Sequence, residues 1–351
     1  MSKTDYFKIL ESIGKDEKPS GPNDRILIVD GLNTFIRSFA ANPVTNEDGI
    51  HVGGMTGFLM SIGYAIRNIK PTRVIICWDG KGGSQRRRKV FENYKANRRV
   101  RTRLTRHGNY NSQEDESMAM RNQIMRLTQY LEVLPVTMVS VENIEADDSM
   151  AYICKQLYPD SQCHIMSTDK DFLQLINKNI SIWSPTKKKF YFGDTMKQEY
   201  NIPANNFLIY RTLEGDASDN IPGIRGIGLK TVVKLFPMIC EDSDVSIDDI
   251  IKHANDNING AKLYSKIIEN EDTIRLNYRL MQLHDVDISG SAKEKIMNSV
   301  RSPINRLVKF EILKMIIEDN MNNVRVFKNP DYWLQNTFLS LDTYAGMTYD
   351  K

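Results

Sequence analysis

Three short apolar segments, each ending in an aspartate, constrain the fold of this chain more than any other feature. They cover Arg25–Asp30, Arg73–Asp79 and Cys163–Asp169. Continuous apolar runs of this length are typical of parallel strands that are buried on both faces. Helical patterns separate them, at Met55–Asn68, Glu114–Leu131 and Asp147–Leu157. This alternation predicts an α/β domain with a mostly parallel central sheet and flanking helices.

The ends of these segments also predict where a ligand would bind. Ligands of parallel sheets gather beyond the carboxyl ends of the strands. Asp30, Asp79 and Asp169 are therefore expected at the same edge of the sheet.

The C-terminal part of the chain has a different pattern. Beyond about residue 213 the strand signal fades, and residues 220–231 form a glycine-rich turn that leads into an apolar helix through Phe236. Further helical patterns occupy about 246–284 and 304–320, whereas residues 332–351 show no clear period. We expect an all-helical C-terminal third.

Composition excludes several classes of protein. The 351 residues are 41% hydrophobic, enough for a buried core, so disorder is excluded as the dominant state. The longest apolar stretches, such as Val74–Trp78, are far shorter than the roughly 18 residues needed to cross a bilayer. We expect a soluble, cytoplasmic protein. The four cysteines have no paired spacing, which indicates neither structural disulfides nor zinc.

Positive charge is concentrated in one internal segment. Eleven lysines and arginines and a single acid, Glu92, lie between Lys81 and Arg106, although the net charge of the whole chain is only +3. A basic run is often a solvated or disordered segment. Here, however, Phe91 and Tyr94 interleave the cations, and this combination is typical of contacts to nucleic-acid strands.

Nine acidic residues could converge near the predicted sheet edge. Besides the three terminal aspartates, they are Glu145, Asp147, Asp148, Asp171, Asp216 and Asp219. Each acid alone has a simpler interpretation, because aspartate at a strand end often caps the next helix. Together they would repel one another unless cations bound there. Oxygen ligands without a histidine or cysteine cluster favour Mg²⁺ or Mn²⁺, and two such ions can catalyse phosphodiester hydrolysis.

Six short motifs carry a resemblance to a known family. They are Val29–Asn33, Trp78–Gly82, Tyr94–Arg98, Glu145–Asp148, Ser167–Phe172 and Gly215–Gly223. In this order they resemble the flap endonuclease/5′–3′ exonuclease family, particularly the stand-alone bacteriophage enzymes. The resemblance covers roughly residues 25 to 285. It implies a PIN-like 5′-nuclease fold with a helical arch and a helix-hairpin-helix element.

The resemblance also implies roles for individual residues. Asp30, Asp79, Glu145 and Asp147, with Asp148 nearby, match the first metal site of the family, and Asp169, Asp171, Asp216 and Asp219 match the second. Two Mg²⁺ ions are implied, with Mn²⁺ as a substitute. Lys95 and Arg98 match the basic pair that acts on the scissile phosphate, and Tyr94 matches an aromatic that stacks on the terminal base.

DNA contacts are implied for two further groups of residues. The basic segment resembles the helical arch, with Lys81, Arg86 and Arg87 as DNA contacts. The glycine turn resembles the helix-hairpin-helix, in which Gly223, Gly226, Gly228, Lys230 and Thr231 would contact duplex phosphates. In the family such a loop can also hold a monovalent cation such as K⁺.

We therefore expect four regions: a polar leader at 1–24, a nuclease core at 25–212 with the arch at about 81–112, a helix-hairpin-helix region at 213–290, and a helical extension and tail at 291–351. The expected function is a monomeric, structure-specific 5′-nuclease for replication or repair. Its substrates would be DNA with a 5′ flap, nick or fork and RNA–DNA primer duplexes, and either terminus could bind a single-strand-binding or replication protein. The alternatives are a non-catalytic junction-binding factor and a PIN-like ribonuclease.

Overall fold

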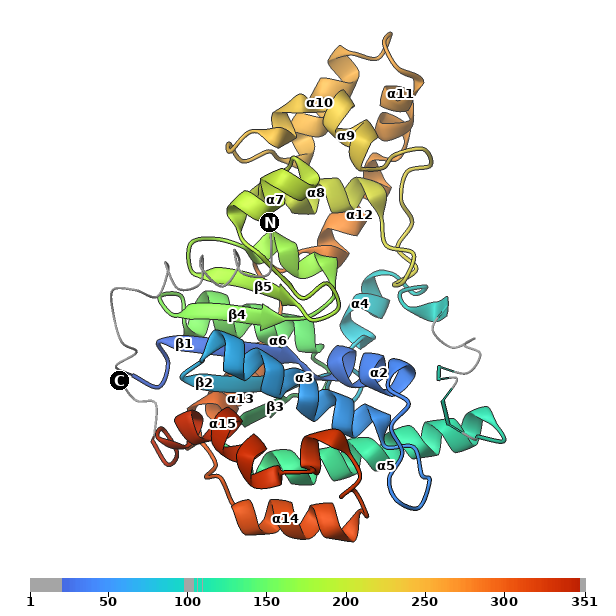
Figure 1. Ribbon diagram of the computed structural model, residues 1–351. Helices are drawn as coiled ribbons and strands as arrows, with labels where there is room; N and C mark the ends of the chain where they lie inside the picture. Colours follow the sequence, from blue (N-terminus) through green and yellow to red (C-terminus); the bar gives the residue numbers. More distant parts are fainter. Residues whose placement is uncertain (1–20, 98–103, 106, 109, 348–351) are drawn as a thin grey trace.

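The computed structural model describes residues 21–97, 104–105, 107–108 and 110–347 (Figure 1). Six strands form one sheet in the order β3-β2-β1-β4-β5-β6. Their bounds are β1 (Arg25–Asp30), β2 (Arg73–Trp78), β3 (Thr137–Ser140), β4 (Gln162–Met166), β5 (Ile180–Ser184) and β6 (Lys189–Tyr191). All neighbouring pairs are parallel except β5 with β6, so the expected α/β fold with a mostly parallel sheet is confirmed.

The N-terminal helices pack on both faces of this sheet. They are α2 (Gly31–Ala41), α3 (Gly53–Ile69), α4 (Gln85–Val90), α5 (Gln113–Glu132), α6 (Ala146–Tyr152) with a π-helical continuation (Ile153–Leu157), a 3₁₀ helix (Lys170–Leu175) and α7 (Gly193–Tyr200). Ile26 and Ile28 of β1 point into one core, and Leu27 and Val29 point into the other. The apolar run of β1 is continuous because both faces of the strand are buried.

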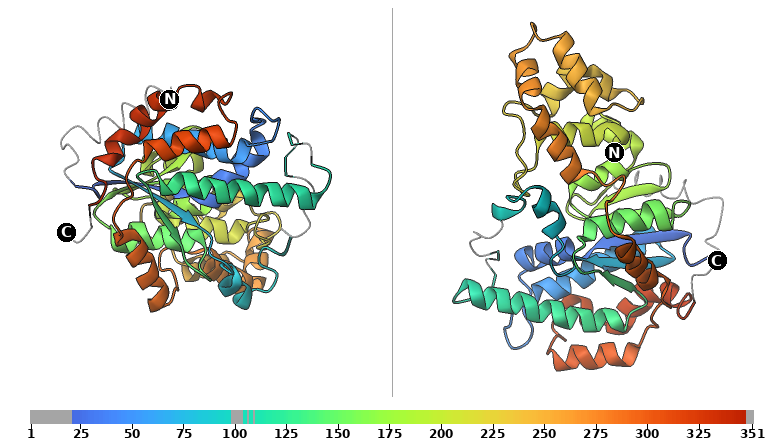
Figure 2. Two further views of the ribbon diagram at one scale, coloured as in Figure 1. Left: turned by 90° about the horizontal axis from the view of Figure 1, so that it is seen from below. Right: turned by 180° about the vertical axis from the view of Figure 1, so that it is seen from behind.

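The C-terminal part of the described chain is entirely helical, as expected. Its helices are α8 (Ala204–Glu214), α9 (Leu229–Leu235), a 3₁₀ turn (Pro237–Cys240), α10 (Ile247–Asp256), α11 (Lys262–Glu269), α12 (Glu271–Met281), α13 (Gly290–Arg301), α14 (Lys309–Glu318), a 3₁₀ turn (Arg325–Phe327) and α15 (Pro330–Asp342). Figure 2 shows α14 and α15 on the same side of the sheet as α5, with α10 and α11 at the opposite end of the molecule.

Several elements differ from the sequence-based expectation. The segment at 332–351 was expected to lack a clear period, but 330–342 form α15, and its buried Trp333, Phe338 and Leu341 pack in the same core as α3. The helical patterns expected at 246–284 correspond to α10, α11 and α12. Strands β3, β5 and β6 were not predicted. No helix among the described residues is long and apolar enough to span a membrane.

Candidate active site

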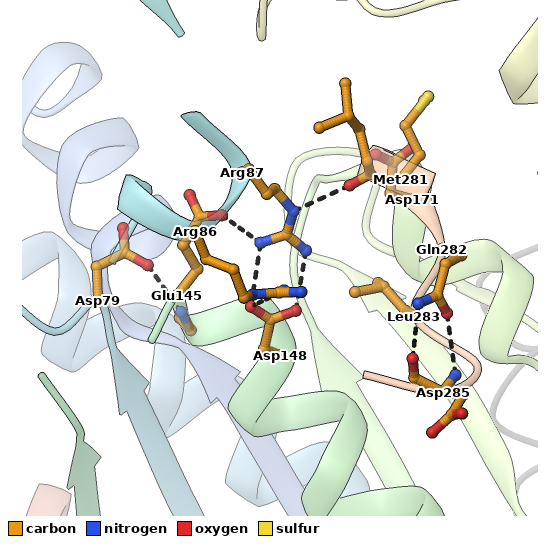
Figure 3. Close-up of polar contacts among 12 residues, drawn as sticks. Asp79, Arg86, Arg87, Glu145, Asp148, Asp171, Met281, Gln282, Leu283 and Asp285 are labelled. Carbon is orange, nitrogen blue, oxygen red and sulfur yellow. Dashed lines mark hydrogen bonds and ion pairs between the residues drawn. The ribbon is translucent and has the colours of Figure 1, made fainter. Parts of the chain in front are cut away.

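The acids at the ends of β1 and β2 lie at the carboxyl edge of the sheet, and each also accepts a hydrogen bond from a backbone N–H. Asp30 caps α2 by accepting a hydrogen bond from the Asn33 N–H at 3.1 Å, and the Ser167 hydroxyl donates to its other oxygen at 3.0 Å. Asp79 accepts from the Ala146 N–H at 2.8 Å and so holds the start of α6 (Figure 3). The capping interpretation is thus correct for Asp30, and it does not remove the residue from the site.

Asp169 and Asp171 follow β4 at the same edge. Asp169 caps the 3₁₀ helix, accepting a hydrogen bond from the Asp171 N–H at 2.8 Å. Burial, together with the neighbouring Asp171 carboxylate, raises the pKa of Asp169 to about 7. Burial and the nearby Asp79 raise the pKa of Asp30 to about 6, even though Asn33 and Ser167 donate hydrogen bonds to it. These carboxylates lie close enough together to oppose one another's ionisation.

The three acids at the start of α6 have different surroundings. Asp147 is part-buried, and burial with the nearby Asp169 and Glu145 raises its pKa well above the usual range. Burial alone would also raise the pKa of Glu145, but ion pairs with Arg87 and Lys95 outweigh it and hold the pKa at about 2. Asp148 is 1% exposed, and both of its oxygens accept from arginines.

Arg87 is a buried connector, because its side chain links α4 to residues of α6 and α12 (Figure 3). Its guanidinium pairs with Glu145 and with Asp148 at 2.9 Å, and its Nε donates to the carbonyl of Leu280 in α12 at 2.9 Å. The expected DNA contact of Arg87 is therefore corrected, because every partner of this 5% exposed side chain lies inside the protein. Asp148, for which the resemblance implies a place near the first metal site, pairs with Arg86 Nη2 at 2.8 Å and with Arg87.

Tyr94 also occupies a different position from the one expected. Its side chain is 2% exposed and packs among Leu208, Ile221, Leu280 and Met281. Its hydroxyl lies 3.3 Å from Glu145 Oε2 and 3.2 Å from Asp219 Oδ2. A ring packed in this way has no free face for a terminal base, so the stacking role is corrected. Tyr94 instead places its hydroxyl beside two of the acids, Glu145 and Asp219.

Lys95 brings a cation into the acidic cluster. Its backbone has a φ of +57°, and its ammonium pairs with Glu145 and lies 3.8 Å from Asp219 Oδ2. Burial would lower the pKa of Lys95, but Glu145, Asp147 and Asp219 raise it above the usual value, so the side chain stays charged. Arg98, the other member of the expected basic pair, lies outside the described residues.

The sequence did not predict that Arg211 of α8 contacts the acidic cluster. Its Nε donates to Asp171 at 2.9 Å, its Nη1 to Glu214 at 2.6 Å and its Nη2 to Asp216 at 2.7 Å. This guanidinium orients two of the predicted metal ligands, and a cavity of about 550 Å³ opens beside them. The only signal in the sequence was an isolated cation in the apolar stretch Phe207–Leu213, five residues before Asp216.

The arrangement can be compared with the needs of divalent cations. The donors are carboxylate oxygens, which suit hard ions such as Mg²⁺ and Mn²⁺. Crowded carboxylates with raised pKa values, as at Asp30 and Asp169, would be stabilised by such ions. In the positions that the described side chains adopt, no three His, Cys, Asp or Glu form a group that could hold a metal ion. Lys95 and Arg211 instead lie among the acids.

The glycine turn before α9 begins beside Glu214 and Gly215, next to this cluster, and its residues differ in their surroundings. A Cβ at Gly223 would lie 1.8 Å from the Glu214 carbonyl oxygen, so close packing alone requires this glycine. Gly226 has a φ of +94°. A Cβ at Gly228 would meet nothing within 4 Å, and Lys230 is exposed. Thr231 is half-buried, and Lys81, on the basic segment, is exposed.

A mostly parallel α/β sheet carries acids and a part-buried lysine at its carboxyl edge and is followed by a helical domain, and its sequence matches the resolvase-like domain of 5′–3′ exonucleases. The chain belongs to the 5′–3′ exonuclease family. The family model for the N-terminal resolvase-like domain matches residues 25–201, and that for the C-terminal SAM fold matches 202–302. Both the expected family and the expected structure-specific 5′-nuclease activity are confirmed.

Individual relatives support this assignment. The flap endonuclease Xni of Shewanella halifaxensis is 29% identical over 77% of this chain and 98% of its own length. Xni of Shewanella denitrificans is 30% identical over 74% of this chain and 92% of its own length. Among solved structures, a bacteriophage T5 flap endonuclease in a pseudo-enzyme–product complex with DNA and metal ions shares the fold. Its TM-score is 0.59 at 21% identity, over 83% of this chain and 98% of the other.

Proposed function

We propose that this nuclease uses divalent cations, Mg²⁺ in the first place, to hydrolyse phosphodiesters near the 5′ end of a DNA strand at a flap, nick or fork. RNA–DNA primer duplexes would be a second substrate, and replication or repair the setting. The observation that carries the proposal is the convergence of acids from β1, β4 and α6 with Lys95 at one sheet edge. The relatives named as flap endonucleases, and the T5 complex with DNA and metal ions, support it.

The residues that would hold the ions fall into two groups. Asp30, Asp79 and Asp147 would take one ion, with Glu145 beside them, and Asp169, Asp171, Asp216 and Asp219 would take the other. Bound ions would activate water and neutralise charge on the phosphate. The glycine turn is a candidate for K⁺.

The chain's own side chains would orient the substrate. Lys95 would place its ammonium beside a phosphate that approaches the acids, since its pairing with Glu145 and Asp219 keeps the side chain charged and in place. Arg211 would hold Asp171 and Asp216 at a fixed orientation. Duplex DNA would lie against Gly228 and Lys230, where the backbone is open.

Replacement of Asp169 tests the proposal. Asp169→Asn keeps the side-chain size and a hydrogen-bond acceptor for the Asp171 N–H, but it removes a carboxylate from the cluster. We expect loss of Mg²⁺-dependent cleavage of a labelled 5′ flap, with affinity for the same DNA in Ca²⁺ almost unchanged. Asp160→Asn, at an exposed position, is the control.

Three outcomes would contradict this function. Retained cleavage by Asp169→Asn would defeat the assignment of the acids. DNA binding without any Mg²⁺-dependent product from the unaltered chain would indicate a junction-binding factor. Cleavage of single-stranded RNA in preference to a DNA flap would indicate a ribonuclease.

A further inference from the structure

A groove of about 990 Å³ lies far from the acids, between the C-terminal half of α3 and α15. Lys70–Thr72, which lead into β2, form one end of it, so it opens at the amino edge of the sheet, whereas the candidate active site lies at the carboxyl edge. The helix α15 forms its other wall and lies beyond residue 302, where the second family model ends. The groove therefore lies where the extension packs on the matched N-terminal domain, which contributes α3.

The groove combines an apolar floor with an uncompensated positive charge. Four cations line it, namely Arg67, Lys70, Arg325 and Lys328, and no aspartate or glutamate is among the lining residues. Within the described part of the chain, none of the four forms an ion pair with a carboxylate. Other cations of the same extension do so, for example Lys309 with Asp331 at 2.9 Å.

One buried donor at the groove lacks a partner and points to the kind of group that would bind. Trp333 lines the groove and is 6% exposed, and its indole N–H has no hydrogen-bond acceptor among the described residues. A Cβ at Gly63 would lie 3.2 Å from Trp333 Nε1 and 3.3 Å from Arg67 Nη1, and this arginine atom already donates to Thr337 Oγ1 at 2.7 Å. An unsatisfied buried donor is costly, and a carboxylate could accept a hydrogen bond from the Trp333 indole.

We propose that this groove binds an acidic segment of a partner protein, with an apolar side chain on the floor formed by Met60, Tyr64 and Val326 and carboxylates at the four cations. Charge complementarity selects an acidic ligand. We favour a peptide over a nucleic-acid strand because Met60 and Val326 offer apolar contacts to a side chain, and Tyr332, which is 65% exposed, is the one well-exposed ring among the described lining residues. Tyr64 already stacks on Trp183, with centroids 6.0 Å apart, and Trp333 is packed edge-on against Phe327 and Phe338.

Fluorescence anisotropy of the full chain tests this proposal. The probe is a fluorescein-labelled peptide of alternating glutamate and glycine with a central Phe-Leu pair. We expect saturable binding that weakens at high salt, and a loss of affinity when glutamine replaces glutamate or Ser-Ser replaces Phe-Leu. The double variant Arg325→Glu/Lys328→Glu should bind the peptide about tenfold more weakly.

The matched control is Lys178→Glu/Lys295→Glu, which makes the same change of charge at exposed positions outside the groove. It should leave peptide affinity unaltered, and both double variants should cleave a 5′ flap at the rate of the unaltered chain. Lack of saturable binding, or equal affinity in both double variants, would overturn the proposal. Displacement of the peptide by a single-stranded oligonucleotide, with the same sensitivity to Arg325→Glu/Lys328→Glu, would assign the groove to nucleic acid instead.

Discussion

Lys95 and Asp219 are joined twice, once through the backbone and once through their side chains. The Lys95 N–H donates to the Asp219 carbonyl at 2.8 Å, and the Lys95 ammonium lies 3.8 Å from the Asp219 carboxylate. The two residues come from the basic segment and from the loop between α8 and α9, which are more than a hundred positions apart in the sequence. This contact fixes the base of the basic segment against the helical domain at the site itself.

Lys95→Ala is expected to slow cleavage much more than it weakens DNA binding. The backbone contact would persist, but the charge beside Glu145 would be lost, and a preorganised charge at a reacting phosphate contributes roughly 10²- to 10³-fold to rate. Single-turnover cleavage of a 5′ flap gives the rate, and anisotropy in Ca²⁺ gives the affinity. An unchanged rate with weaker binding would make Lys95 a simple phosphate contact.

Two variants serve as controls for this prediction. Lys89→Ala removes an exposed cation from the same basic segment and should affect the rate little. Lys95→Arg keeps the charge and should recover part of the rate.

Arg87→Met is expected to destabilise the fold by roughly 3–5 kcal/mol, because it leaves the buried Glu145 without one of its cations and breaks the contact with the Leu280 carbonyl. Urea unfolding followed by circular dichroism measures the change. The added replacement Asp148→Asn should restore part of the stability, since it removes the other charge that Arg87 neutralises. Lys89→Met, on the same helix but exposed, is the control, and equal stability of Arg87→Met and Lys89→Met would contradict the connector role.

The sequence predicted those features that depend on local pattern or on topology. The strands β1, β2 and β4 were placed within a few residues because each is buried on both faces and reads as an unbroken apolar run. Topology then placed Asp30, Asp79 and Asp169 at one edge. The helix α15 was missed because Thr337 interrupts its buried apolar face, and β6 because it has only three residues.

Contacts between side chains that lie far apart in the sequence could not be predicted from it. Within the run Arg86–Arg88, the three side chains carry equal charge, and only the tertiary fold buries Arg87 between α6 and α12. The same holds for Tyr94, whose place in a basic segment suggested exposure. Its ring is instead buried by Leu208 and Leu280, which lie far away in the sequence.

Gly228→Thr is expected to weaken duplex binding about tenfold without loss of stability. The backbone at Gly228 is extended, a Cβ there meets nothing within 4 Å, and threonine is as good a helix N-cap as glycine. An effect on DNA affinity would therefore come from obstruction of the phosphate backbone. Gly223→Ala should instead destabilise the fold by about 1–3 kcal/mol through its contact with the Glu214 carbonyl. Unaltered affinity of Gly228→Thr for nicked duplex DNA would exclude close approach at this turn.

The buried His164 of β4 is expected to make the protein less stable in acid. Burial, with a smaller effect of Arg25, lowers the pKa of His164 to about 3, and its Nδ1 lies 2.7 Å from the Ser181 hydroxyl. In the unfolded chain the ordinary pKa of histidine is about 6.5, so between these values the unfolded state binds a proton that the folded state does not. The free energy of unfolding should then fall as the pH drops below about 6.5, by about 2 kcal/mol at pH 5.

The variant His164→Asn lacks this contribution. The gap in free energy of unfolding between the unaltered chain and this variant, measured by urea unfolding, should therefore be smaller at pH 5 than at pH 7.5. A constant gap for His164→Asn would refute the prediction.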